Sequence, residues 1–206
     1  MTALFLSAFV TLFVVIDPPG CAPIFAGLTQ SATAPHRRAM AIRSTMVASA
    51  ILFLFALFGE ALLATLGISL AAFRIAGGIM LFLIALEMVF ERRTERRENR
   101  AAEVSRTPDH DDISIFPMAI PMIAGPGSIA MVMLLMSRSN GLAESLVVLA
   151  ALGAVLILTL LALMAAGPIM RALGPKLEAM ITRVLGVILA ALAAQFVIDG
   201  IKASFG

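Results

Sequence analysis

The sequence predicts an all-α membrane protein with six transmembrane helices, arranged as two inverted repeats of three helices each. Three observations support this prediction: an apolar composition, six apolar runs long enough to cross a bilayer, and two similar Pro-Gly interruptions about half the chain apart. Hydrophobic residues make up 61% of the 206 residues and charged residues only 14%, and the mean hydropathy is +1.03. A soluble domain could not cover so much apolar side chain with so little polar surface. We therefore expect this chain to be embedded in a lipid bilayer.

The expected membrane spans follow from length, because a helix needs about 20 apolar residues to cross a bilayer. The qualifying segments are roughly 2–29, 42–64, 69–90, 113–137, 142–166 and 178–201. The first lacks the basic start and the small-residue cleavage site of a signal peptide, so we expect it to be a span. The polar stretch between the third and fourth spans divides the chain into a first repeat (1–90), a charged cytoplasmic linker (91–112) and a second repeat (113–206).

Two spans contain helix-breaking residues at corresponding places. The first span is interrupted at 17–20, in Ile16-Asp17-Pro18-Pro19-Gly20-Cys21, and the fourth at 124–127, in Ile123-Ala124-Gly125-Pro126-Gly127-Ser128. Proline lacks the backbone N–H and glycine adds backbone freedom, so each motif should break its helix. A bilayer tolerates such a break only where the backbone is buried in protein or lines a cavity. Paired breaks therefore indicate a transporter with its site between them.

A second pair of motifs supports the duplication. Arg74-Ile75-Ala76-Gly77-Gly78-Ile79 in the third span matches Arg183-Val184-Leu185-Gly186-Val187-Ile188 in the sixth. Gly77 and Gly186 are 109 residues apart, and Gly20 and Gly127 are 107 residues apart. With three spans in each half, the second copy enters the membrane from the opposite side, which makes the repeat an inverted one. The alternative is coincidence among similar apolar segments.

The basic residues predict the orientation of the chain. Most basic residues fall in three loops that are expected on one side of the membrane. The loop after the first span holds Arg37, Arg38 and Arg43, the central loop holds Arg92, Arg93, Arg96, Arg97, Arg100 and Arg106, and the loop before the sixth span holds Arg171 and Lys176. The other side has Arg138 and Lys202. Cytoplasmic loops carry the excess of Lys and Arg, so these three loops are expected inside and both termini outside. The basic residues form no separate exposed stripe, so we expect no nucleic-acid partner.

Four segments of the chain resemble motifs of the MarC family of bacterial inner-membrane proteins. That family is similar to the LysE-type exporters. The similar segments are Asp17-Pro18-Pro19-Gly20-Cys21-Ala22-Pro23-Ile24-Phe25, Arg74-Ile75-Ala76-Gly77-Gly78, Ala124-Gly125-Pro126-Gly127-Ser128-Ile129 and Phe196-Val197-Ile198-Asp199-Gly200-Ile201. One departure is Cys21, where the family often has Asn. The resemblance covers essentially the whole chain. It implies a multi-pass protein of the bacterial inner membrane, with periplasmic termini in the orientation above, that exports small molecules.

The candidate substrate and ion site consists of Asp17, Pro18, Gly20, Cys21, Gly125, Gly127 and Ser128. Asp17 precedes a proline and can cap the half-helix 18–29. A carboxylate deep in a span also suggests proton or ion coupling. The second break has no acidic residue, and its bare amides and positive helix end suit an anion. A site with one carboxylate and one bare helix end could hold a zwitterion such as an amino acid.

Other polar residues within the spans have gating or structural interpretations. Arg74 and Arg183 could reach the headgroups or bond to carbonyls released at the breaks, or they could act in gating. Gln195 is expected to bond across helices. Gly77, Gly78 and Gly186 should let helices approach closely, and we expect the same of Gly153 and Gly167. Asp199, Glu60 and Glu87 fall near span ends and are expected at the interface.

The sequence gives no support for catalysis or for a cofactor. No Walker, Gly-x-Ser-x-Gly or His-Glu-x-x-His motif occurs, so we expect neither an enzyme nor ATP-driven transport by this chain. The methionines near the second break are better explained as gap-filling side chains than as a Cu(I) path with Cys21, so no metal is predicted.

The sequence therefore predicts a secondary exporter of a small polar or zwitterionic solute, coupled to protons through Asp17. The alternatives are a channel for ions or small solutes and a membrane scaffold or regulator that acts through 91–112. The expected partners are the lipid bilayer, the solute, protons and a second copy in a homodimer, since small transporters of this size often dimerise.

Overall fold

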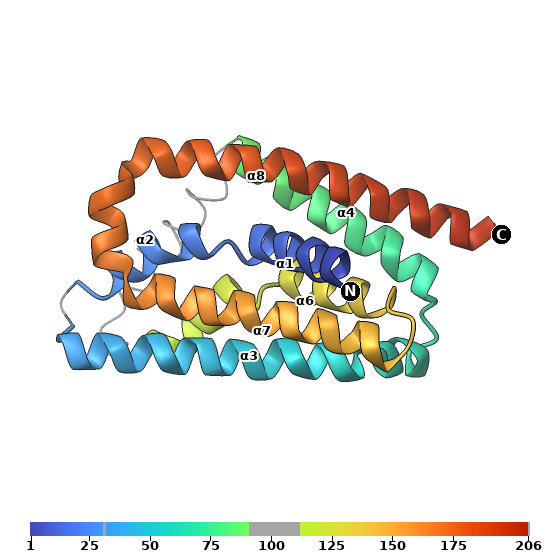
Figure 1. Cartoon of the computed structure of the whole chain (residues 1–206), viewed down its shortest axis with the longest axis horizontal. Coiled ribbons are helices and arrows are strands. Elements are labelled where there is room, and N and C mark those ends of the chain that lie inside the picture. Colours follow the sequence, from blue (N-terminus) through green and yellow to red (C-terminus); the bar gives the residue numbers. More distant parts are fainter. Residues whose placement is uncertain (31, 91–111, 206) are drawn as a thin grey trace.

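The computed structural model describes residues 1–30, 32–90 and 112–205, except the side chains of 169–178. Every element in these ranges is helical (Figure 1). The elements are α1 (Thr2–Ile16), α2 (Pro18–Leu28), α3 (Ala34–Thr65), α4 (Leu70–Val89), η1 (Ser114–Ile123), α6 (Pro126–Met136), α7 (Leu142–Met164) and α8 (Ala166–Phe205). The linker predicted at 91–112 lies outside the described residues except for Asp112.

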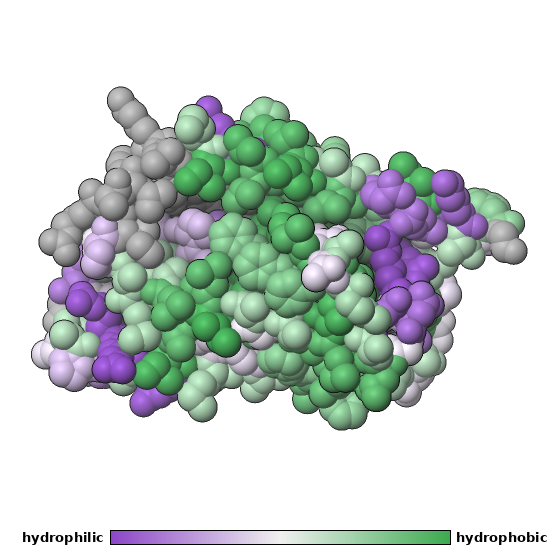
Figure 2. Space-filling view, viewed as in Figure 1, coloured by the Kyte–Doolittle hydropathy of each residue, from purple (hydrophilic) through white to green (hydrophobic). Residues whose placement is uncertain are grey.

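The described helices form a multi-pass membrane protein. Five segments are long and apolar enough to cross a bilayer, and the bent pair of η1 and α6 makes a sixth if it is counted as one span. Large apolar side chains such as Leu54, Phe58 and Val187 are exposed. Figure 2 shows a broad apolar surface with hydrophilic residues gathered toward the two ends of the bundle. The prediction of an all-α membrane protein is confirmed at this level.

Two helices extend beyond the spans expected from hydropathy. The structure starts α3 at Ala34 rather than near 42, with Pro35 in its first turn. It also starts α8 at Ala166, whereas the sixth span was expected to begin near residue 178. Hydropathy marks where a helix meets lipid, whereas its end depends on capping and backbone geometry, so polar extensions are missed.

Helices α4 and α8 pack together along glycines. A Cβ atom built on Gly78 would lie 2.7 Å from the Val197 side chain and 2.9 Å from the Ala193 carbonyl oxygen. A Cβ on Gly186 would lie 2.9 Å from the Cβ of Met88. The expected close approach at these glycines is confirmed. For Gly153 the nearest atom would be 4.0 Å away, and for Gly167 none would lie within 4 Å, so the same prediction was wrong for both.

The chain connections divide between the two ends of the bundle (Figure 1). Both termini, the α3–α4 connection and the α6–α7 connection lie at one end, which we call the termini end. The α2–α3 connection, the α7–α8 turn and the start of η1 lie at the opposite end, which we call the linker end. The C-terminal half of α1 and most of α2 are buried between these ends, in the core of the bundle.

Candidate functional site

The first candidate feature is the interruption between α1 and α2. Helix α1 ends at Ile16, and Asp17 adopts a left-handed conformation with φ of 60° and ψ of 64°. Asp is one of the few residues with a side chain that tolerates this conformation. The Asp17 Oδ1 atom accepts a hydrogen bond from the Gly20 N–H at 3.1 Å, with Pro18 as the first residue of α2. The expected capping role of Asp17 is confirmed.

Gly20 and Cys21 complete this buried turn. A Cβ atom on Gly20 would lie 2.3 Å from Asp17 Oδ2, so the missing side chain leaves room for the capping carboxylate. The Cys21 thiol points to the carbonyl oxygen of Ile16 at 3.6 Å, at the end of α1. This weak hydrogen bond helps to satisfy a carbonyl near the end of the first half-helix. Asp17 is 2% exposed and Cys21 is fully buried, so this turn lies inside the bundle.

The second candidate feature is the bend between η1 and α6. Segment η1 is irregular: Phe116 and Ile120 have extended backbone angles, and Pro117 and Pro121 lie inside the segment. Between η1 and α6 the helix axis bends by 51°. Gly125 precedes α6 without a side-chain cap, and a Cβ there would lie 2.5 Å from the Pro121 carbonyl oxygen. This half-helix therefore begins with Pro126 and Gly127 and has no acidic cap, unlike α2.

The two interruptions lie near each other in the core. A Cβ atom on Gly127 would lie 2.4 Å from Ile84 of α4 and 3.6 Å from Val15, in the last turn of α1. Ser128, next in the chain, is 3% exposed. The fold thus brings the start of α6 against the end of α1, two residues before Asp17. The residues singled out from the two motifs therefore belong to one buried region.

A groove of about 730 Å³ opens beside the second interruption. Its walls come from α4, η1 and the first turn of α6, and its lining residues are Met80, Leu83, Ile84, Glu87, Phe116, Ile120, Pro121, Pro126 and Gly127. Glu87 is the charged residue among them, and Asp17 does not line the groove. The sequence interpretation placed Glu87 at the interface because it is near the end of its span. The signal that was missed is its helical spacing from Met80, Leu83 and Ile84, which places all four on one face of α4.

A polar cluster joins α4, the α6–α7 connection and α8 at the termini end. Arg138 forms an ion pair with Asp199, and its guanidinium lies 4.0 Å from the centre of the Phe196 ring. Burial lowers the pKa of Arg138 and the nearby Arg74 charge lowers it further, whereas Asp199 acts in the opposite direction. Arg74 donates a hydrogen bond to the Ser137 carbonyl oxygen at 2.9 Å. Arg74 therefore binds the carboxyl end of α6 rather than a carbonyl released at an interruption.

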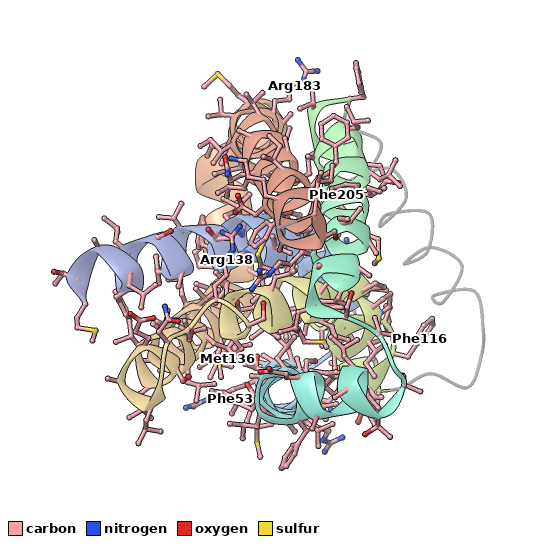
Figure 3. All side chains as sticks on the ribbon, turned by 90° about the vertical axis from the view of Figure 1, so that its right-hand side faces the viewer. Phe53, Phe116, Met136, Arg138, Arg183 and Phe205 are labelled. Carbon is pink, nitrogen blue, oxygen red and sulfur yellow. The ribbon has the colours of Figure 1, made fainter. Side chains whose placement is uncertain are left out.

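The other polar residues predicted within spans lie elsewhere. Gln195 donates to Asp199 Oδ1 at 2.7 Å, one turn further along the same helix. The expectation that Gln195 bonds across helices was therefore wrong, because its side chain is exposed and a carboxylate lies at i+4. Arg183 is exposed, and Figure 3 places it at the edge of the bundle, away from Arg138.

A smaller ionic contact holds the start of η1 at the linker end. Asp112 pairs with Arg43 of α3, and its Oδ1 atom accepts a hydrogen bond from the Ser114 N–H at 2.9 Å. Burial raises the pKa of Asp112, but the Ser114 hydrogen bonds and the Arg43 charge outweigh it, so the pKa lies below its ordinary value. The sequence interpretation assigned no role to this pair.

Comparisons with known proteins agree with this architecture. Residues 2–205 match the family described as MarC family integral membrane protein. A UPF0056 membrane protein of Methanocaldococcus jannaschii is 37% identical over 198 residues, which cover 96% of each chain. The UPF0056 membrane protein YvbG of Bacillus subtilis is 34% identical, covering 100% of this chain and 97% of its own. The UPF0056 inner membrane protein YhgN of Escherichia coli is 33% identical, covering 96% and 95%. No solved structure matches. The chain therefore belongs to the MarC family of integral membrane proteins.

Proposed function

We propose that this protein is a secondary transporter that exports a small polar or zwitterionic solute. The observation that supports this proposal best is the position of the two interruptions. Helices α2 and α6 both begin within the membrane bundle, where Pro18 and Gly127 are buried, and Gly127 lies against Val15 at the end of α1. Half-helices that begin inside a membrane protein direct their free amides and positive ends toward a solute, as broken helices do in secondary transporters.

The inverted repeat forms part of the proposal. Helix α2 runs from the core toward the linker end, whereas α6 runs from the core toward the termini end (Figure 1). Opposite directions are what two copies related by an axis in the membrane plane require. Helices α4 and α8, which pack along Gly78 and Gly186, also run in opposite directions (Figure 1). Rocking of one repeat against the other would then expose the central site to each side in turn.

We further propose that the protein lies in the bacterial inner membrane with its termini in the periplasm. Arg37, Arg38 and Arg43 lie near the start of α3, toward the linker end. An excess of basic residues is typical of cytoplasmic loops, which favours the linker end as the cytoplasmic one. The relative YhgN is itself described as an inner membrane protein.

Asp17 is the proposed proton carrier. Its carboxylate is 2% exposed and caps α2 through Gly20. A carboxylate at this depth in a span is costly, and proton relays are a common reason to retain one. Protonation removes the charge that strengthens the Gly20 hydrogen bond, so proton binding would loosen the start of α2. That link would connect protonation to a movement of the half-helix.

Transport in proteoliposomes tests the function. Vesicles that contain the purified protein are loaded with a set of radiolabelled amino acids, and efflux is followed with and without a pH gradient. We expect saturable efflux and counterflow, with acceleration by the gradient in the wild type and loss of that acceleration in Asp17→Asn. Single-channel currents without counterflow would indicate a channel, and neither activity would favour a scaffold. Gradient-driven efflux that is intact in Asp17→Asn would contradict proton coupling through Asp17.

We propose transport without chemical conversion of the solute, without a cofactor or resident metal, and by a homodimer. Recovery of the exported amino acids unchanged, from protein purified in the presence of a chelator, tests the first parts. Cross-linking in the native membrane tests the dimer.

A further inference from the structure

We propose that a second groove, between α3 and α7, binds an acyl chain of an anionic phospholipid, with Arg38 beside the phosphate of the lipid headgroup. This α3–α7 groove has a volume of about 400 Å³. Its walls run from Ile42 to Phe53 on α3 and from Gly153 to Leu160 on α7, and it shares no lining residue with the groove beside the second interruption. The proposal concerns a lipid bound to the protein and does not depend on transport.

A glycine leaves the space for the α3–α7 groove. A Cβ atom on Gly153 would have one neighbour within 4 Å, the Phe53 Cζ atom at 4.0 Å. Small residues in membrane helices commonly let two backbones approach closely, but here the missing side chain leaves a hollow instead. Met46 and Ile157, which also line the groove, are 66% and 62% exposed. The hollow is therefore open to the surrounding lipid.

The walls of the α3–α7 groove suit a hydrocarbon chain rather than a polar solute. Its two hydroxyl side chains already donate to backbone carbonyls of their own helix: Thr45 to Ala41 at 2.9 Å, and Ser49 to Thr45 at 2.7 Å. The remaining lining residues are apolar side chains and Gly153. Burial against such a surface favours methylene groups and offers a polar group no donor in exchange for its water.

The length of the α3–α7 groove matches one leaflet of a bilayer. From Ile42 to Phe53 the wall on α3 extends about 16 Å, at a rise of about 1.5 Å per residue. The hydrocarbon core of a bilayer is about 30 Å thick, so one leaflet contributes about 15 Å. An acyl chain fits this length, whereas a membrane helix of a second copy would need a contact surface about twice as long.

A basic residue continues the groove at the linker end of the bundle. Arg38 is exposed and lies one helical turn before Ile42, so Arg38, Ile42 and Met46 share one face of α3. The planar guanidinium group matches phosphate oxygens, and the long side chain can reach the headgroup layer. Basic positions between membrane helices are a common way to bind anionic lipids. Arg38 therefore favours an anionic headgroup above the bound chain.

Two neighbouring arginines are less suited to this contact. Arg43 is paired with Asp112 at the start of η1. Arg37 shares its helix face with Ala41 and Ser44, which are buried in the core rather than in the groove. Arg38 is therefore the arginine assigned to the headgroup.

Lipid titration followed by native mass spectrometry tests the proposal. The full-length protein is stripped of lipid in detergent and titrated with dioleoylphosphatidylglycerol or dioleoylphosphatidylcholine, which share both acyl chains and differ in net charge. The spectra give the dissociation constant of the first bound lipid and the oligomeric state of the protein. We expect phosphatidylglycerol to bind about five-fold or more tightly, because one arginine near an anionic lipid contributes about that factor.

Charge variants identify the group that selects the headgroup. Arg38→Gln should weaken phosphatidylglycerol binding about five-fold and leave phosphatidylcholine binding unchanged. Arg183→Gln is the matched control, because it removes the same charge from an exposed position on α8. Figure 3 places Arg183 and the groove residue Phe53 at opposite edges of the bundle, so this variant should bind both lipids like the wild type.

Filling variants identify the place of the acyl chain. Gly153→Leu puts a side chain into the α3–α7 groove and should weaken the binding of both lipids to a similar extent. Met46→Trp fills the groove from α3 and should do the same. This second variant keeps the test decisive if Gly153→Leu fails to fold.

Three results would overturn the proposal. The first is equal affinity of the wild type for the two lipids, or a loss in Arg183→Gln as large as that in Arg38→Gln. The second is wild-type lipid binding by the folded filling variants. The third is a change in the fraction of dimer on filling, without a change in lipid affinity, which would make the groove an interface between copies of the chain.

Discussion

At the scale of single residues, Asp17 combines a structural role with a proposed functional one. Its side chain caps α2 through Gly20, and its backbone takes the left-handed turn that separates the two half-helices. Asn caps helices about as well as Asp and also tolerates the left-handed conformation, whereas Ala does neither. The two substitutions therefore separate the shape of the side chain from its charge.

The first prediction concerns the stability of Asp17 variants. Asp17→Ala should lower the free energy of unfolding by about 1 kcal/mol or more, and Asp17→Asn by only a few tenths. Thermal unfolding of the purified protein in detergent measures both. Equal losses in the two variants would mean that the charge, rather than the cap, provides the stability. In that case Asp17→Asn would no longer be a clean test of proton coupling.

The second prediction concerns two glycines of the same half-helix. Gly20→Ala would drive a Cβ to within 2.3 Å of Asp17 Oδ2 and displace the capping carboxylate from its buried bond. We expect a loss of about 1–3 kcal/mol. Gly27→Ala meets no atom within 4 Å, so it should be neutral or stabilising by up to about 0.5 kcal/mol. A loss of stability in Gly20→Ala without a loss in Gly27→Ala, in parallel unfolding experiments, would support this account, and destabilisation by both changes would contradict it.

At the scale of elements, the close contact between α4 and α8 depends on glycine. Lipid provides no hydrophobic force between helices, so close backbone approach and dispersion hold such a pair together. Gly78 and Gly186 lie at different levels of this contact, and Gly200 continues it toward the termini end, where its Cβ would lie 2.9 Å from the Ala71 carbonyl oxygen. The contact therefore extends along much of α4.

The third prediction tests this contact. Gly78→Ala should destabilise the protein by about 1–3 kcal/mol, because the backbone of Ala193 cannot move aside as a flexible side chain could. Gly153→Ala on α7 is the control, since its Cβ would meet only the Phe53 ring at 4.0 Å. We expect no loss of stability there. Chemical denaturation in mixed micelles compares the two, and similar losses would show that helix geometry rather than interhelical contact explains the effect.

The elements differ in how far the sequence alone could predict them. The turn at Asp17 was predictable because its determinants, Asp, Pro and Gly, lie within four consecutive residues. The groove at Glu87 was not, because it exists only once α4 packs beside η1 and α6. The irregular course of η1 was missed for a related reason: Pro117 and Pro121 signal a disturbance, but tertiary packing decides its shape.

The same distinction applies to the ion pairs and to Gln195. The partners in Arg138–Asp199 are distant in sequence, and so are those in Arg43–Asp112, so no local pattern marks either pair. Gln195 and Asp199 do lie at i and i+4, a spacing that favours a bond within one helix. Local spacing was therefore a better guide to Gln195 than its depth in the span.

At the scale of the whole molecule, the two ends of the bundle differ. At the termini end, Arg74 and Arg138 tie α4, the α6–α7 connection and α8 together through Ser137 and Asp199. The groove, by contrast, runs from Gly127 along α4 to Glu87, close to the end of that helix. In the proposed orientation, the structure is closed by polar contacts on the periplasmic side and hollowed in its cytoplasmic half. This arrangement is the one expected of an exporter that binds its solute from the cytoplasmic side.

The fourth prediction tests that orientation with single cysteines. Cys21 is the only cysteine of the chain, so Cys21→Ala gives a cysteine-free background. Asn140 is exposed in the α6–α7 connection, Thr33 is exposed before α3, and Leu161 is 55% exposed on α7, facing the lipid. In intact cells, a membrane-impermeant maleimide should label Asn140→Cys at once and Thr33→Cys only after permeabilisation. Leu161→Cys should stay unlabelled throughout, because a thiol in hydrocarbon does not form the reactive thiolate. Labelling of Thr33→Cys in intact cells with protection of Asn140→Cys would reverse the orientation, and the groove would then open toward the periplasm, as an importer requires.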